Sequence, residues 1–201
     1  MGERTGLLGG TFNPIHRGHI ELGLQIRKAF ELDRILYILA AHPPHKSNLI
    51  LAAMEVRWKM LTEALKPFPQ LEPCDIEMKR PMMSWTIDTV KELKKNNPDT
   101  EFFFISGSEG FLKIRTWKDY KSLLQALPFI VVLRDSSHTA AVKKLISEEK
   151  GEHVYLFSYE SDKLAISSTL IREKIRHDQK INGLVAMEVK KIMEEYKLYE
   201  A

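Results

Sequence analysis

Short apolar runs alternate with segments of helical periodicity along the whole chain, and this alternation constrains its fold most strongly. The run Phe129–Leu133 is FIVVL, and Arg34–Ala40 is similarly rich in branched and aromatic residues. Strands that are buried on both faces of a parallel sheet have such continuous apolar sequences. Strands that alternate with helices predict the α/β class, with a doubly wound parallel sheet. We expect strands at Thr5–Leu8, Arg34–Ala40, Leu71–Met78, Glu101–Ser106, Phe129–Leu133 and His153–Phe157.

The expected helices fill the intervals between these strands and the end of the chain. Apolar residues at helical spacing indicate them, and Thr86 is the expected N-cap of the third. No internal repeat, low-complexity segment or interdomain linker is visible, so we expect one domain over residues 1–201. Its helical part, from about residue 165 to 201, should pack on the rest. The predicted helices are Gly18–Phe30, Ala52–Leu65, Thr86–Lys95, Lys118–Leu127, Thr139–Glu149, Ser167–Arg176 and Leu184–Tyr196.

Composition excludes several classes of protein. The 201 residues carry 30 basic and 27 acidic side chains, a net charge of +3, without a basic block. This balance argues against a protein that binds nucleic acid by neutralising phosphates. Cys74 is the single cysteine, and no apolar stretch reaches the roughly 18 residues of a membrane span. We therefore expect a cytoplasmic protein that binds neither nucleic acid nor membranes.

The sequence Gly9–His19 (GGTFNPIHRGH) lies between the first expected strand and the first expected helix. In a parallel sheet this position is beyond the carboxyl end of a strand, where ligands bind. Gly9 and Gly10 allow a ligand to approach the backbone, and Gly18 does so at the helix N-terminus, where free N–H groups attract anions. The motif matches neither the Walker sequence nor the dinucleotide-binding G-x-G-x-x-G, so both of those classes are disfavoured.

Two histidines of this motif, His16 and His19, are three residues apart and can project toward one point. Two imidazoles beside an anion could donate hydrogen bonds to phosphate oxygens. The simpler alternative is a glycine turn with two surface histidines. A zinc site is disfavoured because no third ligand has a suitable spacing and Cys74 has no partner cysteine.

Two further motifs follow strands or begin helices. Two prolines after the second expected strand restrict its loop, and His45 and Lys46 come directly after them. These basic groups should lie at the same sheet edge as the first motif, although an exposed basic turn would explain them as well. Trp85 and Thr86 begin the third expected helix, where an ordinary helix cap is the alternative.

A fourth motif follows the apolar run that ends at Ile105. Ser106 and Gly107 come first, the carboxylate of Glu109 follows, and Trp117 lies eight residues after Glu109. Core packing would explain Trp117 equally well.

The fifth motif, Ile166–Arg172 (ISSTLIR), begins the seventh expected helix. Serines at a helix start offer hydroxyl and N–H donors, and Arg172 lies on the same helix face as Ser168 because it is four residues later. This set suits a pyrophosphate, and an N-cap beside a solvated arginine is the alternative. The final segment, Ile181–Tyr199, has the pattern of a packing helix, and we assign it no chemistry.

These five motifs, in this order, resemble one known family over nearly the whole chain. His16 to His19 is similar to the His-x-Gly-His element of a nucleotidyltransferase superfamily, and the longer GGTFNPIH resembles the nicotinate-nucleotide adenylyltransferases. The segments PPHK, SWTIDT and ISSTLIR are similar to the same family, as is the "LY" ending at Tyr199. The resemblance implies a Rossmann-like nucleotidyltransferase fold.

The chain departs from the family pattern at four places. Asn13 stands where the family usually has Asp, Trp85 where it has Tyr, and Glu109 where it has Asp. Arg134 matches a family arginine, but Asp-Ser-Ser follows it in place of a glycine-proline turn. Glu109 is one methylene longer than Asp, so its backbone must lie farther from any ribose.

The resemblance implies adenylyl transfer from ATP to nicotinate mononucleotide, with nicotinate adenine dinucleotide and pyrophosphate as products, a step of NAD biosynthesis. Mg²⁺ would be carried with ATP and held mainly by water and phosphate oxygens, so no protein metal site is expected. The implied catalytic residues are His16, His19, Lys46 and Arg172. The implied ATP-binding residues are Gly9, Gly10, Thr11, Phe12, Gly18, Ser106, Gly107, Glu109, Ile166, Ser167, Ser168 and Thr169. The implied substrate-binding residues are Asn13, His45, Trp85, Thr86, Trp117 and Arg134.

Three alternatives stay open. The amidated substrate, nicotinamide mononucleotide, differs by one charge, and the contacts that would distinguish it are backbone amides. Phosphopantetheine adenylyltransferases are similar in the first motif but usually have Thr in place of His16. A non-catalytic nucleotide sensor is a different class, which Glu109 suggests and the basic residues disfavour. The sequence also leaves a homo-oligomer open.

Overall fold

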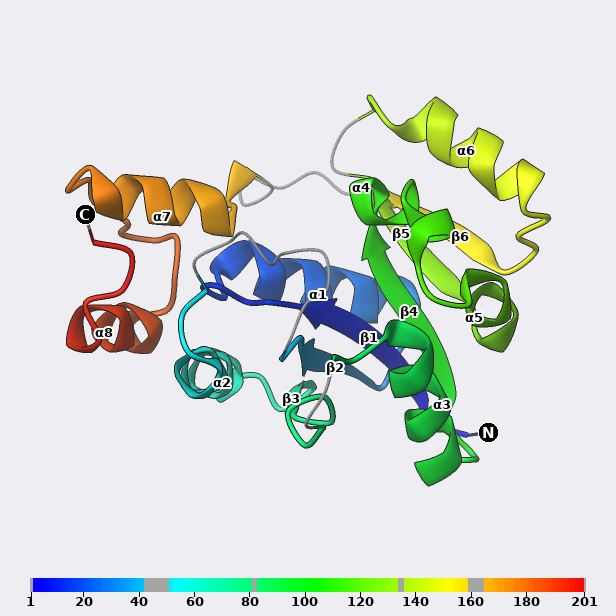
Figure 1. Ribbon diagram of the computed structural model, residues 1–201, viewed down its shortest axis with the longest axis horizontal. Coiled ribbons are helices and arrows are strands. Elements are labelled where there is room, and N and C mark those ends of the chain that lie inside the picture. The colour runs from blue at the N-terminus through cyan, green and yellow to red at the C-terminus, as the bar shows by residue number, and fades with distance from the viewer. Residues whose placement is uncertain (1, 42–50, 81–82, 134–135, 159–164, 201) are drawn as a thin grey trace.

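Six parallel strands form one sheet in the order β3-β2-β1-β4-β5-β6, as the computed structural model of the chain shows (Figure 1). The structure describes residues 2–41, 51–80, 83–133, 136–158 and 165–200. All five pairs of neighbouring strands are parallel. The doubly wound α/β prediction is therefore confirmed. The strands are β1 (Arg4–Gly10), β2 (Arg34–Leu39), β3 (Leu71–Cys74), β4 (Glu101–Gly107), β5 (Phe129–Leu133) and β6 (Val154–Ser158).

Helices connect successive strands, and two more follow the last strand. The sequence analysis missed α4 and the 3₁₀ helix η1, because a single turn of helix is too short to show periodicity. The helices are α1 (Arg17–Ala29), α2 (Met54–Leu65), α3 (Thr86–Asn96), α4 (Ser108–Phe111), η1 (Ile114–Thr116), α5 (Tyr120–Ala126), α6 (Thr139–Glu148), α7 (Ser168–Arg176) and α8 (Met187–Glu195).

One strand is shorter than the sequence predicts. β3 ends at Cys74, and the chain then turns, with the Met78 N–H donating to the Asp75 carbonyl at 2.8 Å. Pro73 lies within β3 and cannot donate a ladder hydrogen bond, which is tolerated because β3 is an edge strand. The apolar residues after Cys74 made the strand look longer than it is.

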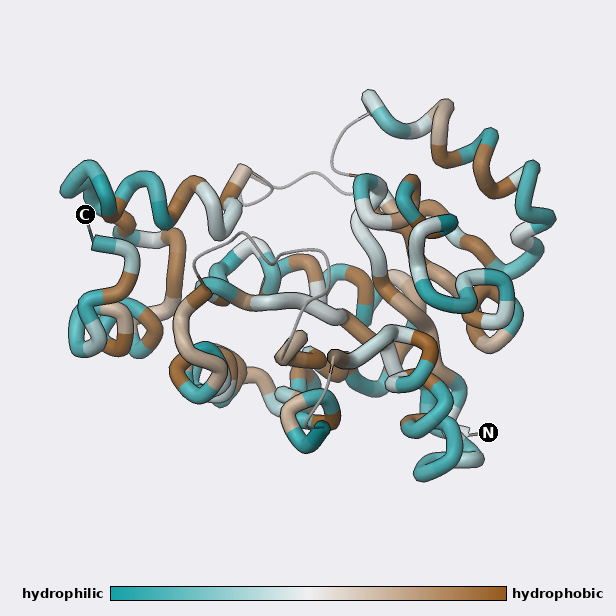
Figure 2. The backbone as a smooth tube through the Cα atoms, viewed as in Figure 1, coloured by the Kyte–Doolittle hydropathy of each residue, from teal (hydrophilic) through white to brown (hydrophobic). Residues whose placement is uncertain are grey.

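Alternate residues of the strands point to opposite faces of the sheet, and each face has its own hydrophobic cluster. On the first face, Ile35, Tyr37 and Leu39 pack with residues of α1, α2, α7 and α8. On the second face, Leu36 and Ile38 pack with residues of α3 to α6. Figure 2 shows apolar strands at the centre, surrounded by helices that carry both hydrophobic and hydrophilic residues. The continuous apolar runs in the sequence therefore reflect burial on both faces.

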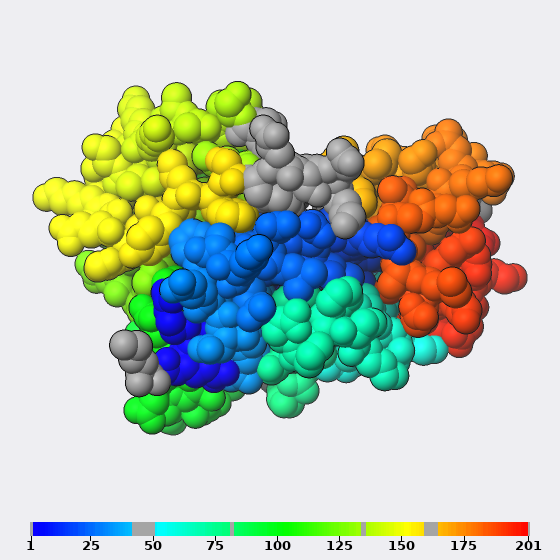
Figure 3. Space-filling view, turned by 180° about the vertical axis from the view of Figure 1, so that it is seen from behind, coloured from blue at the N-terminus to red at the C-terminus, as the bar shows by residue number. Residues whose placement is uncertain are grey.

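The last two helices lie together at one side of the molecule, where α8 packs beside α2 (Figures 1 and 3). The α8 residues Val189, Ile192 and Met193 are buried in the first hydrophobic cluster. Lys59 of α2 and Glu195 of α8 form an ion pair at 3.1 Å across this contact. Within the described part of the chain, no helix is both long and apolar enough to cross a membrane.

Candidate functional site

The strands β1 and β4 are neighbours, yet the helices that follow them cover opposite faces of the sheet. Such a switch point is where α/β sheets bind ligands, beyond the carboxyl ends of the strands. Gly9 in β1 and Gly107 in β4 are both exposed, and a Cβ atom on either would meet no other atom within 4 Å. The ends of these two strands therefore leave room for a ligand against the backbone. Gly10 differs, because a Cβ there would lie 3.0 Å from the ring of Phe12.

The structure brings His16 and His19 together at the start of α1. Their rings stack with centroids 3.7 Å apart and an interplanar angle of 26°. The backbone N–H of His16, the N-cap residue, donates to Nδ1 of His19 at 3.3 Å. A ring nitrogen that accepts a hydrogen bond carries no proton, so in the neutral ring the His19 proton resides on Nε2. That atom can then donate to an anion.

Phe12 and Tyr37 hold the histidines in place. The ring of Phe12 meets that of His19 in an edge-on contact with centroids 5.2 Å apart. Phe12 has a left-handed backbone (φ 44°), which is uncommon for an aromatic residue and points to tertiary constraint. The Tyr37 hydroxyl donates to the His19 carbonyl at 2.8 Å, and a Cβ at Gly23 would collide with that hydroxyl.

Arg57 of α2 is a structural residue of the site that the sequence analysis missed. Its side chain is 2% exposed and donates to four backbone carbonyls. Nη1 contacts Thr11 at 3.1 Å and Ala40 at 2.8 Å, while Nη2 contacts Ala41 at 3.1 Å and Nε contacts Ala52 at 3.0 Å. Burial lowers the pKa of this guanidinium. Arg57 thus ties the loop after β1 to the end of β2. A charged residue on the apolar face of α2 was the signal for it.

The fifth motif, at the start of α7, contacts the loop of residues 11–16 after β1, which we call the histidine loop. Ser168 Oγ donates to the Pro14 carbonyl at 2.8 Å, and Arg172 Nη1 donates to the Asn13 carbonyl at 2.8 Å. Arg172 Nη2 also donates to Thr169 Oγ1 at 3.1 Å, and burial lowers the pKa of Arg172. In this structure the donors therefore hold the loop backbone.

Two other members of that motif have structural roles as well. Ser167 is the N-cap of α7 and accepts the Leu170 N–H at 3.1 Å, so the capping alternative holds for this residue. Ile166 is 7% exposed and belongs to the first hydrophobic cluster.

The fourth motif lies at the end of β4. The Ser106 hydroxyl donates to the Gly107 carbonyl at 3.1 Å, and Glu109 is exposed in the first turn of α4. Ser108, which the sequence analysis did not single out, is buried, and its hydroxyl lies 3.0 Å from Nδ1 of His138. Glu109 is therefore open to a ligand on the side of the sheet that carries α4.

The predicted aromatic residues of the substrate site, Trp85 and Trp117, both pack against the second hydrophobic cluster. Trp117 packs edge-on against Phe104 with centroids 5.8 Å apart. Lys118 lies 5.8 Å from the ring of Trp85 and pairs with Asp88 at 3.0 Å, which brings the segment after η1 to the start of α3.

The expected cap of α3 is wrong. The helix begins at Thr86 itself, and its N-cap is Trp85, which has an extended backbone and makes no side-chain capping bond.

Three predicted site residues, His45, Lys46 and Arg134, lie outside the described residues. Among the residues that are described, no group of three or more His, Cys, Asp or Glu side chains could hold a metal ion.

Comparison with known proteins places this geometry among nucleotidyltransferases. A family model described as cytidylyltransferase-like matches residues 7–174. The probable nicotinate-nucleotide adenylyltransferase of Geotalea uraniireducens is 34% identical to this chain over 98% of both sequences. That of Clostridium botulinum is 31% identical, also over 98% of both.

Solved structures agree in fold. The nicotinic acid mononucleotide adenylyltransferase of Plasmodium falciparum in complex with NaAD has a TM-score of 0.80 and 22% identity, covering 98% of this chain and 97% of that chain. The same protein in complex with APC has a TM-score of 0.77 and 21% identity over the same shares.

Proposed function

The chain belongs to the cytidylyltransferase-like family, among the nicotinate-nucleotide adenylyltransferases, and from this premise we propose that it joins nicotinate mononucleotide to ATP. The products are nicotinate adenine dinucleotide and pyrophosphate. The observation that carries the proposal is the stacked pair His16 and His19 at the start of α1, beside the open ends of β1 and β4.

The reaction needs alignment and charge stabilisation more than a side-chain base. A phosphate oxygen of the mononucleotide, already ionised at neutral pH, attacks the α-phosphorus of ATP. The bond from that phosphorus to the bridging oxygen breaks, and pyrophosphate leaves with the electron pair. Negative charge spreads over the phosphate oxygens during the transfer, so well-placed donors lower the barrier. We assign this role to His16 and His19.

The fifth motif supports binding of the leaving pyrophosphate. A guanidinium has five N–H donors, and the two hydrogen bonds that Arg172 makes leave others for phosphate oxygens. Ser168 and Arg172 already contact the histidine loop, so a phosphate chain near the histidines would lie within their reach. Lys46 is proposed for the same phosphates by its sequence position alone.

The two ends of the dinucleotide have different candidate sites. Glu109, exposed after β4, is proposed to accept the ATP ribose hydroxyls. Trp85, Thr86 and Trp117 are proposed to bind the pyridine end, because they gather where α3 begins. Asn13, His45 and Arg134 complete the proposed substrate set.

We propose that Mg²⁺ arrives with ATP. Phosphate oxygens and water would hold the ion, because Mg²⁺ keeps several waters and binds largely through substrate phosphates. A cytoplasmic location, a single domain over residues 1–201 and self-association of the chain are also proposals.

Pyrophosphate release from ATP tests the function. Purified protein is supplied with nicotinate mononucleotide, nicotinamide mononucleotide or phosphopantetheine in separate reactions. Rapid release with nicotinate mononucleotide is the expected result. Faster release with nicotinamide mononucleotide or with phosphopantetheine would instead identify the adenylyltransferase that uses that substrate. Release with none of the three would support the non-catalytic nucleotide sensor.

A further inference from the structure

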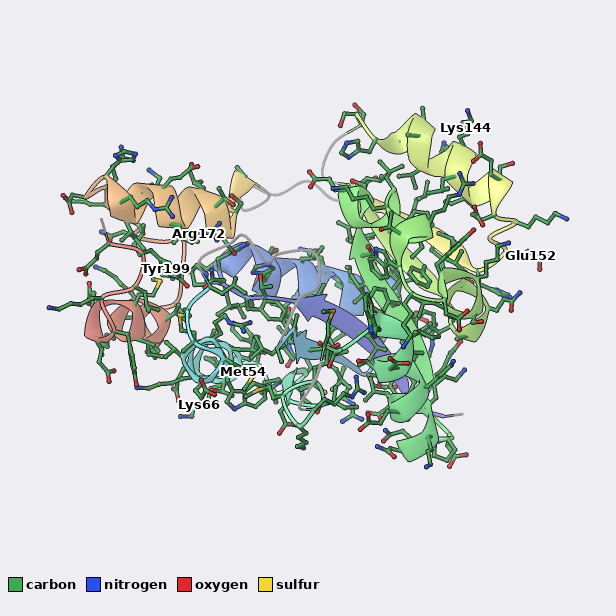
Figure 4. All side chains as sticks on the ribbon, in the orientation of Figure 1. Met54, Lys66, Lys144, Glu152, Arg172 and Tyr199 are labelled. Carbon is green, nitrogen blue, oxygen red and sulfur yellow. The ribbon has the colours of Figure 1, made fainter. Side chains whose placement is uncertain are left out.

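Tyr199, in the segment after α8, reaches the histidine loop. Its hydroxyl donates to Asn13 Oδ1 at 2.7 Å, and its ring packs against the first hydrophobic cluster. Its backbone has a φ of +67°, in the left-handed region that a bulky side chain rarely adopts. The chain thus turns sharply after α8 and carries this ring toward the site. Figure 4 shows Tyr199 and Arg172 at the same end of the molecule.

Asn13 connects this contact to the loop that carries the histidines. The Asn13 side chain is 2% exposed, and its Oδ1 also accepts the Ala52 N–H at 3.0 Å. Its carbonyl accepts Arg172 Nη1, as described above. Asn13 is three residues before His16, so a shift of its side chain would move the start of α1.

The Tyr199 hydroxyl keeps its proton at neutral pH and acts as the donor of this hydrogen bond. Burial raises the pKa of Tyr199 well above its ordinary value, although Arg172 and Arg57 lower it. The net direction keeps the proton on the hydroxyl. The amide oxygen of Asn13 accepts the hydrogen bond from this hydroxyl.

We propose that Tyr199 is a positioning residue for adenylyl transfer. Its hydroxyl holds Asn13 and thereby fixes the loop from Thr11 to His16, so that His16 and His19 meet the α-phosphate in one geometry. The proposal rests on the proposed function for its kinetic consequence, but the loop contact itself does not depend on it.

The test replaces Tyr199 with phenylalanine, which keeps the ring and removes the hydroxyl. Since misplacement of reacting groups by about 1 Å costs up to about a hundredfold in rate, we expect Tyr199→Phe to lower kcat about tenfold. KM for ATP should change less than about twofold, because the contact acts on alignment rather than on binding. The melting temperature should fall by no more than about 4 °C, the effect of losing one hydrogen bond.

Hydrogen exchange supplies a readout that does not need activity. Amides of residues 11–19 should exchange faster in Tyr199→Phe than in the unchanged protein, while those of β1 and β5 keep their rates. Asn13→Ala removes the same contact from the loop side, and the double variant should be no slower in kcat than the worse single variant. Tyr196→Phe, an exposed tyrosine of the same segment, is the matched control and should leave kcat and exchange unchanged.

The outcomes separate the two proposals. If the unchanged protein releases no pyrophosphate but Tyr199→Phe still loosens residues 11–19, the function fails and the positioning contact stands. If kcat and exchange both stay unchanged, or if only the melting temperature falls, Tyr199 is a packing residue and the inference is overturned.

Discussion

His19 makes contacts that fix its ring and its tautomer, and both bear on its proposed role. Its Nδ1 accepts a backbone N–H, and its ring is stacked on His16 and touches the edge of Phe12. The Nε2 proton is thus held in a constrained position. A donor that is already oriented costs no reorganisation when charge develops on the phosphate.

Replacing His19 with alanine should therefore affect the reaction more than the fold. We expect His19→Ala to lower kcat by at least about tenfold, toward the hundredfold that loss of one such donor costs. Steady-state kinetics and circular dichroism measure the two effects. His177→Ala, an exposed histidine after α7, is the control. An unchanged kcat in His19→Ala would remove this residue from the mechanism.

The opposite result is expected for Arg57, whose hydrogen bonds to the described residues go to backbone carbonyls. Arg57→Met leaves four carbonyls without their partner in a buried site, so the free energy of unfolding should fall by at least about 3 kcal/mol. Denaturant unfolding measures this loss. Arg115→Met removes an exposed arginine that pairs with Glu148 and Glu149, and it should change stability far less. Equal losses of unfolding free energy in the two variants would contradict this structural role of Arg57.

At the scale of elements, the carboxyl ends of β1 and β4 form the proposed binding edge. The neighbours of Gly9 and Gly107 leave both positions open, whereas Phe12 already fills the space beside Gly10. Openness at two adjacent strand ends is what a nucleotide that lies across them requires. The glycines therefore have different roles although the sequence presents Gly9 and Gly10 as equivalent.

Adding one methyl group at either open glycine should weaken ATP binding without destabilising the fold. We expect Gly9→Ala and Gly107→Ala to raise KM for ATP about fivefold, which corresponds to about 1 kcal/mol of lost contact. The melting temperature should stay unchanged because the new Cβ meets no protein atom within 4 Å. Gly151→Ala, in the connection between α6 and β6, is the control for binding: its Cβ would lie 2.9 Å from Val154 Cγ2, so the melting temperature should fall while KM for ATP stays unchanged. Unaltered KM values would show that ATP does not approach these strands.

At the scale of the whole molecule, the helices α7 and α8 contribute to the proposed site as well as to the core. α8 packs on α2, and α7 contributes Ser168 and Arg172 to the loop after β1. The proposed single domain therefore implies that these helices unfold together with the sheet.

Unfolding of a core variant of α8 tests that cooperativity. Ile192→Ala should lower the free energy of unfolding by about 2–5 kcal/mol, the usual cost of emptying a buried isoleucine site. Circular dichroism and tryptophan fluorescence should report one coincident transition. Met187→Ala, on the same helix but 67% exposed, is the control. A separate early transition would show that α7 and α8 form an independent unit.

Local patterns determined most of the fold and the first elements of the site. β5 is buried on both faces, and its continuous apolar sequence FIVVL reflects this. The strand can therefore be predicted from these five residues without knowing which distant residues pack on it. The proximity of His16 and His19 likewise follows from a spacing of three residues. β3 was predicted too long because the apolar residues after Cys74 continue its pattern. The helices α4 and η1 were missed because a single turn is too short to show a period.

The contacts that hold the histidine loop depend on chain topology and could not be read in this way. Tyr199 and Asn13 are 186 residues apart, and Arg172 and Asn13 are 159 apart. Packing of α7 and α8 on the first face brings these groups together, and Arg57 joins them from α2. Tyr199 was expected only to pack, because a tyrosine near the end of a helical pattern has the same sequence signal whether its hydroxyl meets water or a buried amide.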